Sequence, residues 1–185
     1  EGAIVSGKLV RSDIVPAAIA LLPDALRHRL QIVQQARAED IDRVTESYRQ
    51  SRSNVALSAF IPDLPERIAD AHLVIGRAGA STIAELTVLG RPAILVPLPG
   101  SIDSDQKYNA LNLQEGGGGW VLEQDTLSPQ SLATRLQELL SDPARLKRAA
   151  EAARSMGQPN AVEKLADLAE MLSGRNTQIQ GRPTP

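Results

Sequence analysis

The sequence predicts an α/β protein with a Rossmann-like parallel sheet flanked by helices, and three observations support this. Short apolar runs alternate with longer segments of helical pattern, as they do in repeated β-α units. Hydrophobic residues make up 42% of the chain but aromatic residues only 2%. Ala, Leu, Ile and Val must therefore build the core, as in parallel strands covered by helices. Finally, residues 69–100 contain a strand, a small-residue loop, a helix and a second strand in succession.

The N-terminal part of the chain is expected to alternate helix and strand. Ser12 and Asp13 can cap a helix that extends to about Leu22, with Pro16 in its first turn, where proline is tolerated. An apolar run then predicts a strand, a charged segment a helix, and an alternating segment a second strand, at residues 30–34, 39–51 and 55–60.

The middle of the chain alternates in shorter segments, and the C-terminal part reads only as helix. Helices are expected at residues 64–71, 81–89 and 106–115, and buried or short strands at 73–76, 92–97 and 120–123. Gly90 ends the second of these helices, and the four glycines Gly116–Gly119 predict a flexible C-cap and turn. Further helices are expected at residues 128–140, 143–156 and 160–172, followed by a polar tail at 175–185.

Composition excludes several classes of function. The net charge of −2 gives no broad field to recruit nucleic acid. The chain has no cysteine, which excludes disulfides, thiolate metal ligands and cysteine nucleophiles. No apolar run is long enough to cross a bilayer and no secretory signal is visible, so we expect a soluble, intracellular protein.

The loops after three expected strands are the candidate site, because the carboxyl ends of parallel strands open on one edge of a sheet. These loops are Phe60–Asp63, Arg77–Ser81 and Pro97–Asp105. The second leads into a helix whose free N–H groups suit an anionic or hydroxyl-rich ligand. Glu85 lies one turn further along that helix, where a carboxylate can accept hydrogen bonds from sugar hydroxyls. Nucleotide-sugar binding is the first hypothesis.

Each of these residues also has a structural interpretation. Ser81 or its neighbour can simply cap the helix, and Glu85 can be a solvated helix residue. Arg77 can form a surface ion pair or meet a phosphate or sugar. Phe60 can belong to the core or pack on a flat base, and Asp63 can cap the next helix.

The remaining polar candidates are weaker. Asp103 and Asp105 lie close together in the sequence, but no clustered third ligand supports a metal site, and we expect none. Gln106 and Asn109 suit sugar hydroxyls better. His28 and His72 have no acidic or serine partner at motif spacing, so structural roles are expected for them.

Four segments resemble the donor-binding domain of the MurG family, in order and at the family's spacing. They are FIPD at 60–63, AHLVIGRAGASTIAE at 71–85, PAILVP at 92–97 and DQKYNA at 105–110. That family is the N-acetylglucosaminyltransferase of peptidoglycan synthesis, with the two-domain GT-B fold. The likeness extends from about Ser12 to Leu172.

The resemblance implies that UDP-N-acetylglucosamine (UDP-GlcNAc) is the ligand. By analogy the Ile61 backbone reads the uracil with Phe60 nearby, Glu85 takes the ribose hydroxyls, and Gln106 with Asp105 contacts the GlcNAc ring. The stretch after the small-residue loop would hold sugar and phosphate. The candidate substrate-binding residues are Phe60, Ile61, Arg77, Ala80, Ser81, Thr82, Ile83, Ala84, Glu85, Asp105 and Gln106.

The family activity implies further partners but no cofactor and no structural metal. The sugar passes with inversion to lipid I, the lipid-linked muramyl-pentapeptide, forming lipid II on the cytoplasmic face of the inner membrane. The family protein is peripheral on that membrane.

The chain departs from the family pattern at its start. The family's donor domain opens with a strand and a Gly-Gly-Ser-Gln-Gly-Ala loop, whereas only Gly7 fits within Ala3–Lys8. We therefore expect residues 1–11 to be a divergent or foreign leader, 12–173 the UDP-sugar donor-binding domain, and 174–185 a disordered tail. The family's N-terminal acceptor domain is absent from this sequence and no residue is a convincing general base. We expect the chain alone to be inactive, with its catalytic residues unknown.

Two alternatives remain open. One is a non-catalytic nucleotide-sugar-binding or interaction module. The other is a different GT-B enzyme such as a UDP-GlcNAc 2-epimerase, which needs paired acid/base carboxylates and a histidine that this sequence does not assemble.

Overall fold

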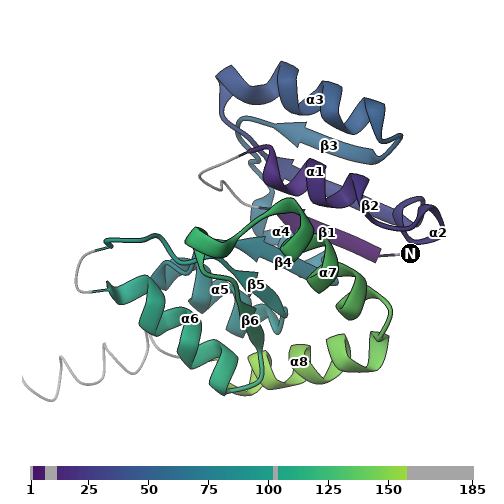
Figure 1. Cartoon of the computed structure of the whole chain (residues 1–185). Helices are drawn as coiled ribbons and strands as arrows, with labels where there is room; N and C mark the ends of the chain where they lie inside the picture. The colour runs from purple at the N-terminus through teal and green to yellow at the C-terminus, as the bar shows by residue number, and fades with distance from the viewer. Residues whose placement is uncertain (1, 7–11, 102–103, 158–185) are drawn as a thin grey trace, which may run out of the picture.

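A six-stranded parallel sheet forms the centre of the molecule (Figure 1). The computed structural model describes residues 2–6, 12–101 and 104–157, and the following statements concern these residues. The strands lie in the order β3-β2-β1-β4-β5-β6. They are β1 (Gly2–Ser6), β2 (Leu30–Gln35), β3 (Asn54–Ser58), β4 (Leu73–Gly76), β5 (Ala93–Leu95) and β6 (Gly119–Val121). This is the doubly wound Rossmann order, in which the chain reverses its direction of travel between β1 and β4.

Helices cover both faces of the sheet. One hydrophobic cluster packs α1 (Ile14–Ala20), α3 (Ile41–Gln50) and α7 (Pro129–Leu140) on one face. A second cluster packs α4 (Leu64–Asp70), α5 (Ala80–Leu89), α6 (Asp105–Glu115) and α8 (Pro143–Ser155) on the other. The short elements are α2 (Asp24–Arg27) and the 3-10 turns η1 (Ala38–Asp40) and η3 (Gln124–Thr126).

Strand β4 shows why its sequence is continuously apolar. Leu73 and Ile75 belong to the first cluster and Val74 to the second, because successive side chains point to opposite faces. All four residues of the strand are buried. A strand buried on both faces reads as an apolar run, and this confirms the interpretation of residues 73–76 as a buried strand.

The predicted elements within the described residues are confirmed, with no end shifted by more than two residues. The four-residue helix α2 was not predicted, since it follows Pro23 as a single turn without apolar periodicity. The expected helix at 160–172 and the expected tail lie outside the described residues.

The structure places five residues of the expected leader in the sheet. Gly2–Ser6 form β1, which pairs in parallel with β2 on one side and β4 on the other. A short run such as Ala3-Ile4-Val5 is typical of a central parallel strand. These residues are therefore part of the sheet, while 7–11 lie outside the described residues.

Gly116, Gly117 and Gly118 form the predicted C-cap and turn, and Gly119 begins β6, but this run is packed rather than flexible. Gly117 has φ +80°, a conformation that favours glycine. A Cβ on Gly118 would lie 2.8 Å from Leu113 Cδ1 and 2.9 Å from Ala153 Cα. The glycines let the end of α6 and the start of β6 approach α8.

In the part of the chain that the structure describes, no helix is both long enough and apolar enough to span a membrane.

Candidate functional site

The three candidate loops lie at one edge of the sheet, because all six strands are parallel and each loop follows the carboxyl end of a strand (Figure 1). They follow β3, β4 and β5 and lead into α4, α5 and α6. The edge includes the carboxyl end of β4, which borders the reversal point of the sheet. In open α/β sheets this is where ligands bind.

The loop after β4 presents the start of α5. Gly79 is the N-cap, with φ −64° and ψ 153°. The first backbone hydrogen bond of the helix runs from the Ile83 N–H to the Gly79 carbonyl at 3.0 Å. The N–H groups of Ala80, Ser81 and Thr82 have no hydrogen-bond partner among the described residues. They form the positive end of the helix dipole.

Ser81 does not cap this helix. It stands inside the first turn, and no side chain caps α5. The interpretation of Ser81 as the cap of this helix is therefore wrong. Within the described part of the chain, neither its hydroxyl nor that of Thr82 makes a hydrogen bond.

Glu85 lies four residues after Ser81, on the same face of α5 and one turn below the open N–H groups. It is exposed, and its carboxylate has no hydrogen bond or ion pair among the described residues. Ile83 is half-buried in the same helix, and Ala84 is exposed beside Glu85. A donor group with two hydroxyls, such as a ribose, would find a free acceptor here.

The approach to the α5 N-terminus is open. A Cβ on Gly79 would meet no heavy atom within 4 Å. Asn109 fixes the preceding peptide, since its Nδ2 donates to the Ala78 carbonyl at 3.0 Å. A ligand can thus reach the backbone of a loop whose position is held by α6.

The Arg77 side chain connects the loop after β4 to the loop after β5 and to η3. Its guanidinium donates to the carbonyls of Val96 at 2.9 Å and Pro97 at 3.1 Å, and to Gln124 Oε1 at 2.7 Å. Partial burial lowers the pKa of Arg77 from its usual value. Among the described residues Arg77 has no ion pair, so the surface ion-pair interpretation is wrong. Its direct contact with a ligand stays a prediction.

Gln106 and Asp105 form the start of α6. Gln106 Oε1 accepts from the Leu98 N–H at 3.1 Å, which leaves Nε2 as the free end of the amide. Asp105 Oδ1 accepts from the Gln106 N–H at 2.7 Å. Asp103 lies outside the described residues, and those that are described hold no group of three His, Asp or Glu side chains placed to bind a metal.

The loop after β3 contains an aromatic ring beside a small pocket. Phe60 is 72% exposed, so the interpretation of Phe60 as a core residue is wrong. A pocket of about 200 Å³ is lined by Phe60, Ile61, Pro62 and residues of β2 and β3. Asp63 stands at the N-cap of α4 but makes no capping bond, and its carboxylate pairs with Arg67 at 2.8 Å instead.

The histidines lie away from this edge. His28 follows α2 and is exposed, and His72 directly precedes β4, at the opposite edge of the sheet. His72 contributes to an apolar groove with Leu26, Leu30 and Leu146.

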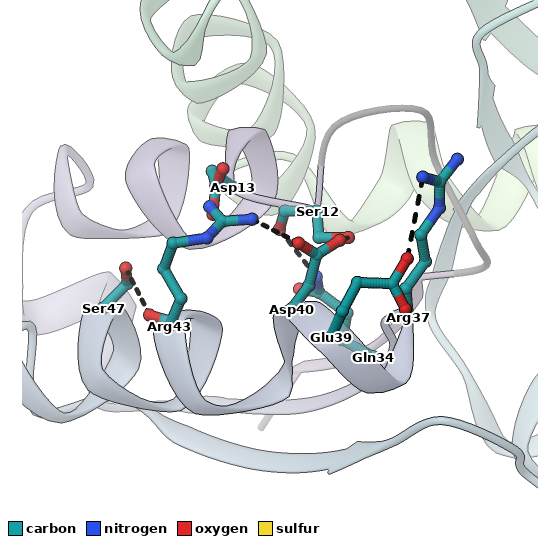
Figure 2. Close-up of polar contacts among 8 residues, drawn as sticks. All are labelled: Ser12, Asp13, Gln34, Arg37, Glu39, Asp40, Arg43 and Ser47. Carbon is teal, nitrogen blue, oxygen red and sulfur yellow. Dashed lines mark hydrogen bonds and ion pairs between the residues drawn. The ribbon is translucent and has the colours of Figure 1, made fainter.

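A partly buried polar network between the end of β2 and the starts of α1 and α3 was missed by the sequence reasoning, and Figure 2 shows the part of it around Ser12, Asp40 and Arg43. Gln34 Nε2 donates to the Ser12 carbonyl at 2.9 Å, and Tyr48 donates to Gln34 Oε1 at 2.5 Å. The Ser12 hydroxyl donates to Asp40 at 2.9 Å, and Arg43 joins Asp40 to Asp13. The only signal in the sequence was a pair of glutamines at the end of an apolar strand.

Residues 8–170 match the family described as the glycosyltransferase family 28 C-terminal domain. The chain belongs to this family. The match covers most of the chain, including all three loops of the candidate site, and it confirms the resemblance drawn from the sequence motifs.

The chain is also similar to proteins that are named as N-acetylglucosamine transferases. The chain is 54% identical over 162 residues to the protein of Rhodospirillum rubrum named UDP-N-acetylglucosamine–N-acetylmuramyl-(pentapeptide) pyrophosphoryl-undecaprenol N-acetylglucosamine transferase. It is 50% identical over 162 residues to the protein of that name from Paramagnetospirillum magneticum. The alignments cover 88% of this chain but only 42% and 44% of these relatives, so the chain spans less than half of their length.

Solved structures support the fold. The crystal structure of Acinetobacter baumannii MurG superposes with a TM-score of 0.82 at 27% identity, covering 92% of this chain and 52% of that one. The glycosyltransferase VinC, solved in complex with dTDP, shares the fold with a TM-score of 0.67 at 19% identity, over 92% of this chain and 42% of VinC. The predicted fold class, an α/β domain like the C-terminal half of a GT-B glycosyltransferase, is confirmed.

Proposed function

We propose that this domain binds UDP-N-acetylglucosamine and serves as the donor half of a glycosyltransferase that moves GlcNAc to lipid I, forming lipid II. One observation carries the proposal. The unpartnered N–H groups at the start of α5 lie one turn above the free carboxylate of Glu85. The names of the relatives supply the sugar nucleotide and the acceptor.

The groups around this helix start match the parts of the ligand. The pocket beside Phe60 and Ile61 takes the uracil, Glu85 the ribose hydroxyls, and the backbone of Ala80–Thr82 the diphosphate. Gln106, with Asp105 beside it, contacts the sugar ring. In the transfer the anomeric C–O bond to the diphosphate breaks and UDP leaves. The acceptor oxygen bonds to the anomeric carbon from the opposite face, and the acceptor hydroxyl gives its proton to the catalytic base. The dipole of α5 stabilises the charge that develops on the leaving diphosphate.

The acceptor side of the reaction is assigned to the part of the named relatives that this chain does not span. Lipid I, peripheral contact with the cytoplasmic face of the membrane, and the catalytic base belong to that part of the proposal. The chain alone is then a binding half that turns over little or nothing.

Calorimetric titration with UDP-GlcNAc tests the binding proposal. We expect saturable binding, weakened by Glu85→Ala by about 1–3 kcal/mol, or roughly 5- to 150-fold, because the ribose hydroxyls lose a charged acceptor. No heat at millimolar ligand would exclude the donor site. Binding that Glu85→Ala leaves unchanged would remove the ribose role and favour an interaction module.

A further inference from the structure

The turn after β3 needs a support that the sheet does not supply. Strand β3 is an edge strand of the described sheet and pairs only with β2. The last ladder contact is the pair Gln35 and Ser58, supplemented by the Ala36 N–H bonded to the Ser58 carbonyl at 3.1 Å. The following residues, Ala59 to Ile61, therefore depend on side chains to fix their peptides.

Two side chains do this. Gln35 Nε2, from β2, donates to the Ala59 carbonyl at 3.0 Å. The Ser58 hydroxyl donates to the Phe60 carbonyl at 2.6 Å and lies 3.3 Å from the Phe60 N–H, which donates to it. Gln34 donates to the Ser12 carbonyl from the opposite face of β2, since adjacent strand residues point to opposite sides.

These bonds leave one residue of the turn with both backbone groups available. The carbonyls of Ser58, Ala59 and Phe60 and the N–H of Phe60 are all paired. The N–H and C=O of Ile61 have no hydrogen-bond partner among the described residues. Ile61 is anchored by its buried side chain and lines the pocket beside the exposed Phe60 ring.

One donor and one acceptor on a single residue can distinguish pyrimidines. Uracil offers a carbonyl acceptor beside a ring N–H donor, whereas cytosine offers an amino donor beside a ring nitrogen acceptor. A donor–acceptor pair fixed in space fits one order and leaves polar groups unpaired against the other, which costs binding free energy. A pair that can rotate discriminates less.

We propose that Gln35 and Ser58 are positioning residues that set the selectivity of this site for uracil over cytosine, by holding the peptides on either side of Phe60 so that Ile61 is presented in one orientation. The inference rests on the proposed function, because it takes a nucleoside diphosphate as the ligand of this pocket.

The test compares the affinities for UDP and CDP, each titrated up to millimolar concentration. In Gln35→Ala and Ser58→Ala we expect the ratio of the two affinities to fall by about 5- to 10-fold, because UDP binds more weakly while CDP does not. Ser58→Thr keeps the hydroxyl and should retain the ratio. Gln31→Ala, an exposed glutamine of the same strand without a side-chain hydrogen bond, is the matched control. Thermal unfolding verifies that each variant is folded.

The outcomes separate the two proposals. If the unmodified chain binds UDP and the ratio is unchanged in Gln35→Ala and Ser58→Ala, or both affinities fall equally, the positioning role is wrong while the donor site stands. If the unmodified chain binds neither nucleotide, the proposed function fails and this inference fails with it.

Discussion

At the scale of single residues, two polar groups of the candidate site are exposed and without a partner among the described residues, whereas two buried polar groups of the core are hydrogen-bonded to each other. Glu85 and the Ser81 hydroxyl have no partner among the described residues, and both are exposed at the start of α5. Tyr48 and Gln34, in contrast, are buried and satisfy each other with a hydrogen bond of 2.5 Å. A buried hydroxyl without a partner would cost free energy, whereas an exposed one is available for a ligand.

Tyr48→Phe tests the buried network. Gln34 Oε1 would lose its donor inside the protein, so we expect the free energy of unfolding at pH 7 to fall by about 1–2 kcal/mol. Urea denaturation measures this, and UDP binding should persist in the folded variant. A change below a few tenths of a kcal/mol would show that the network adds nothing to stability.

The same residue predicts a dependence on alkaline pH. Burial raises the pKa of Tyr48 in the folded state above its ordinary value. The contribution of the protonated Tyr48 to the free energy of unfolding is fully present below about pH 10, where unfolded tyrosine is still protonated. It is lost as the pH rises above that value, because the unfolded chain then releases the proton more readily than the folded one. Unfolding curves at pH 9 and 11 should show a smaller loss in Tyr48→Phe than in the unmodified chain. Equal losses would contradict this origin.

At the scale of elements, Gly79 and Gly118 have different structural roles. Gly79 begins α5 with open space where a Cβ would stand, and its φ of −64° suits any residue. Gly118 precedes β6 at the opposite edge of the sheet, where a Cβ would press on Leu113 and Ala153. The first position leaves room for a ligand, and the second lets α6, β6 and α8 pack closely.

The matched pair Gly79→Ala and Gly118→Ala separates binding from folding. Gly79→Ala should change stability by less than about 1 kcal/mol, the modest cost of alanine at an N-cap, but weaken UDP-GlcNAc binding at least ~10-fold by covering the N–H groups. Gly118→Ala should lower stability by about 1–3 kcal/mol through overpacking and leave the affinity unchanged. Denaturation and calorimetry on both variants check this, and the reverse pattern would refute the assigned roles.

The elements themselves were predictable from the sequence because their signals are local. Apolar runs such as residues 73–76 and the glycine after α5 are visible in a short window. The role of Arg77 was not, since its partners Val96, Pro97 and Gln124 are 19 to 47 residues away. The side-chain hydrogen bonds of Gln34 and Gln35 were missed for the same reason, since their acceptors, the carbonyls of Ser12 and Ala59, are 22 and 24 residues away.

At the scale of the whole molecule, the sheet order brings three separate loops to one edge. Residues 60–61, 79–85 and 105–106 come from the ends of three successive strands in the sequence, and parallel pairing places those ends together. The sequence motifs and the α/β pattern predicted this convergence. The path of β1 through the middle of the sheet was not predicted, because five residues without a typical loop after them give little local signal.

We expect the chain alone to bind the donor without completing the transfer. The described residues of the site edge offer several carboxylates, Glu85 and Asp105 among them, but no histidine, and the chain spans less than half of its named relatives. We expect no transfer of GlcNAc to lipid I by this chain alone, measured with radiolabelled donor. Efficient transfer would show that the domain contains its own acceptor site and base.

Calorimetric titration of the chain with UDP-GlcNAc tests the central claim most directly. The account predicts saturable binding with one site per chain, competed by UDP and weakened roughly 5- to 150-fold in Glu85→Ala. A folded chain that releases no heat at millimolar ligand would contradict it.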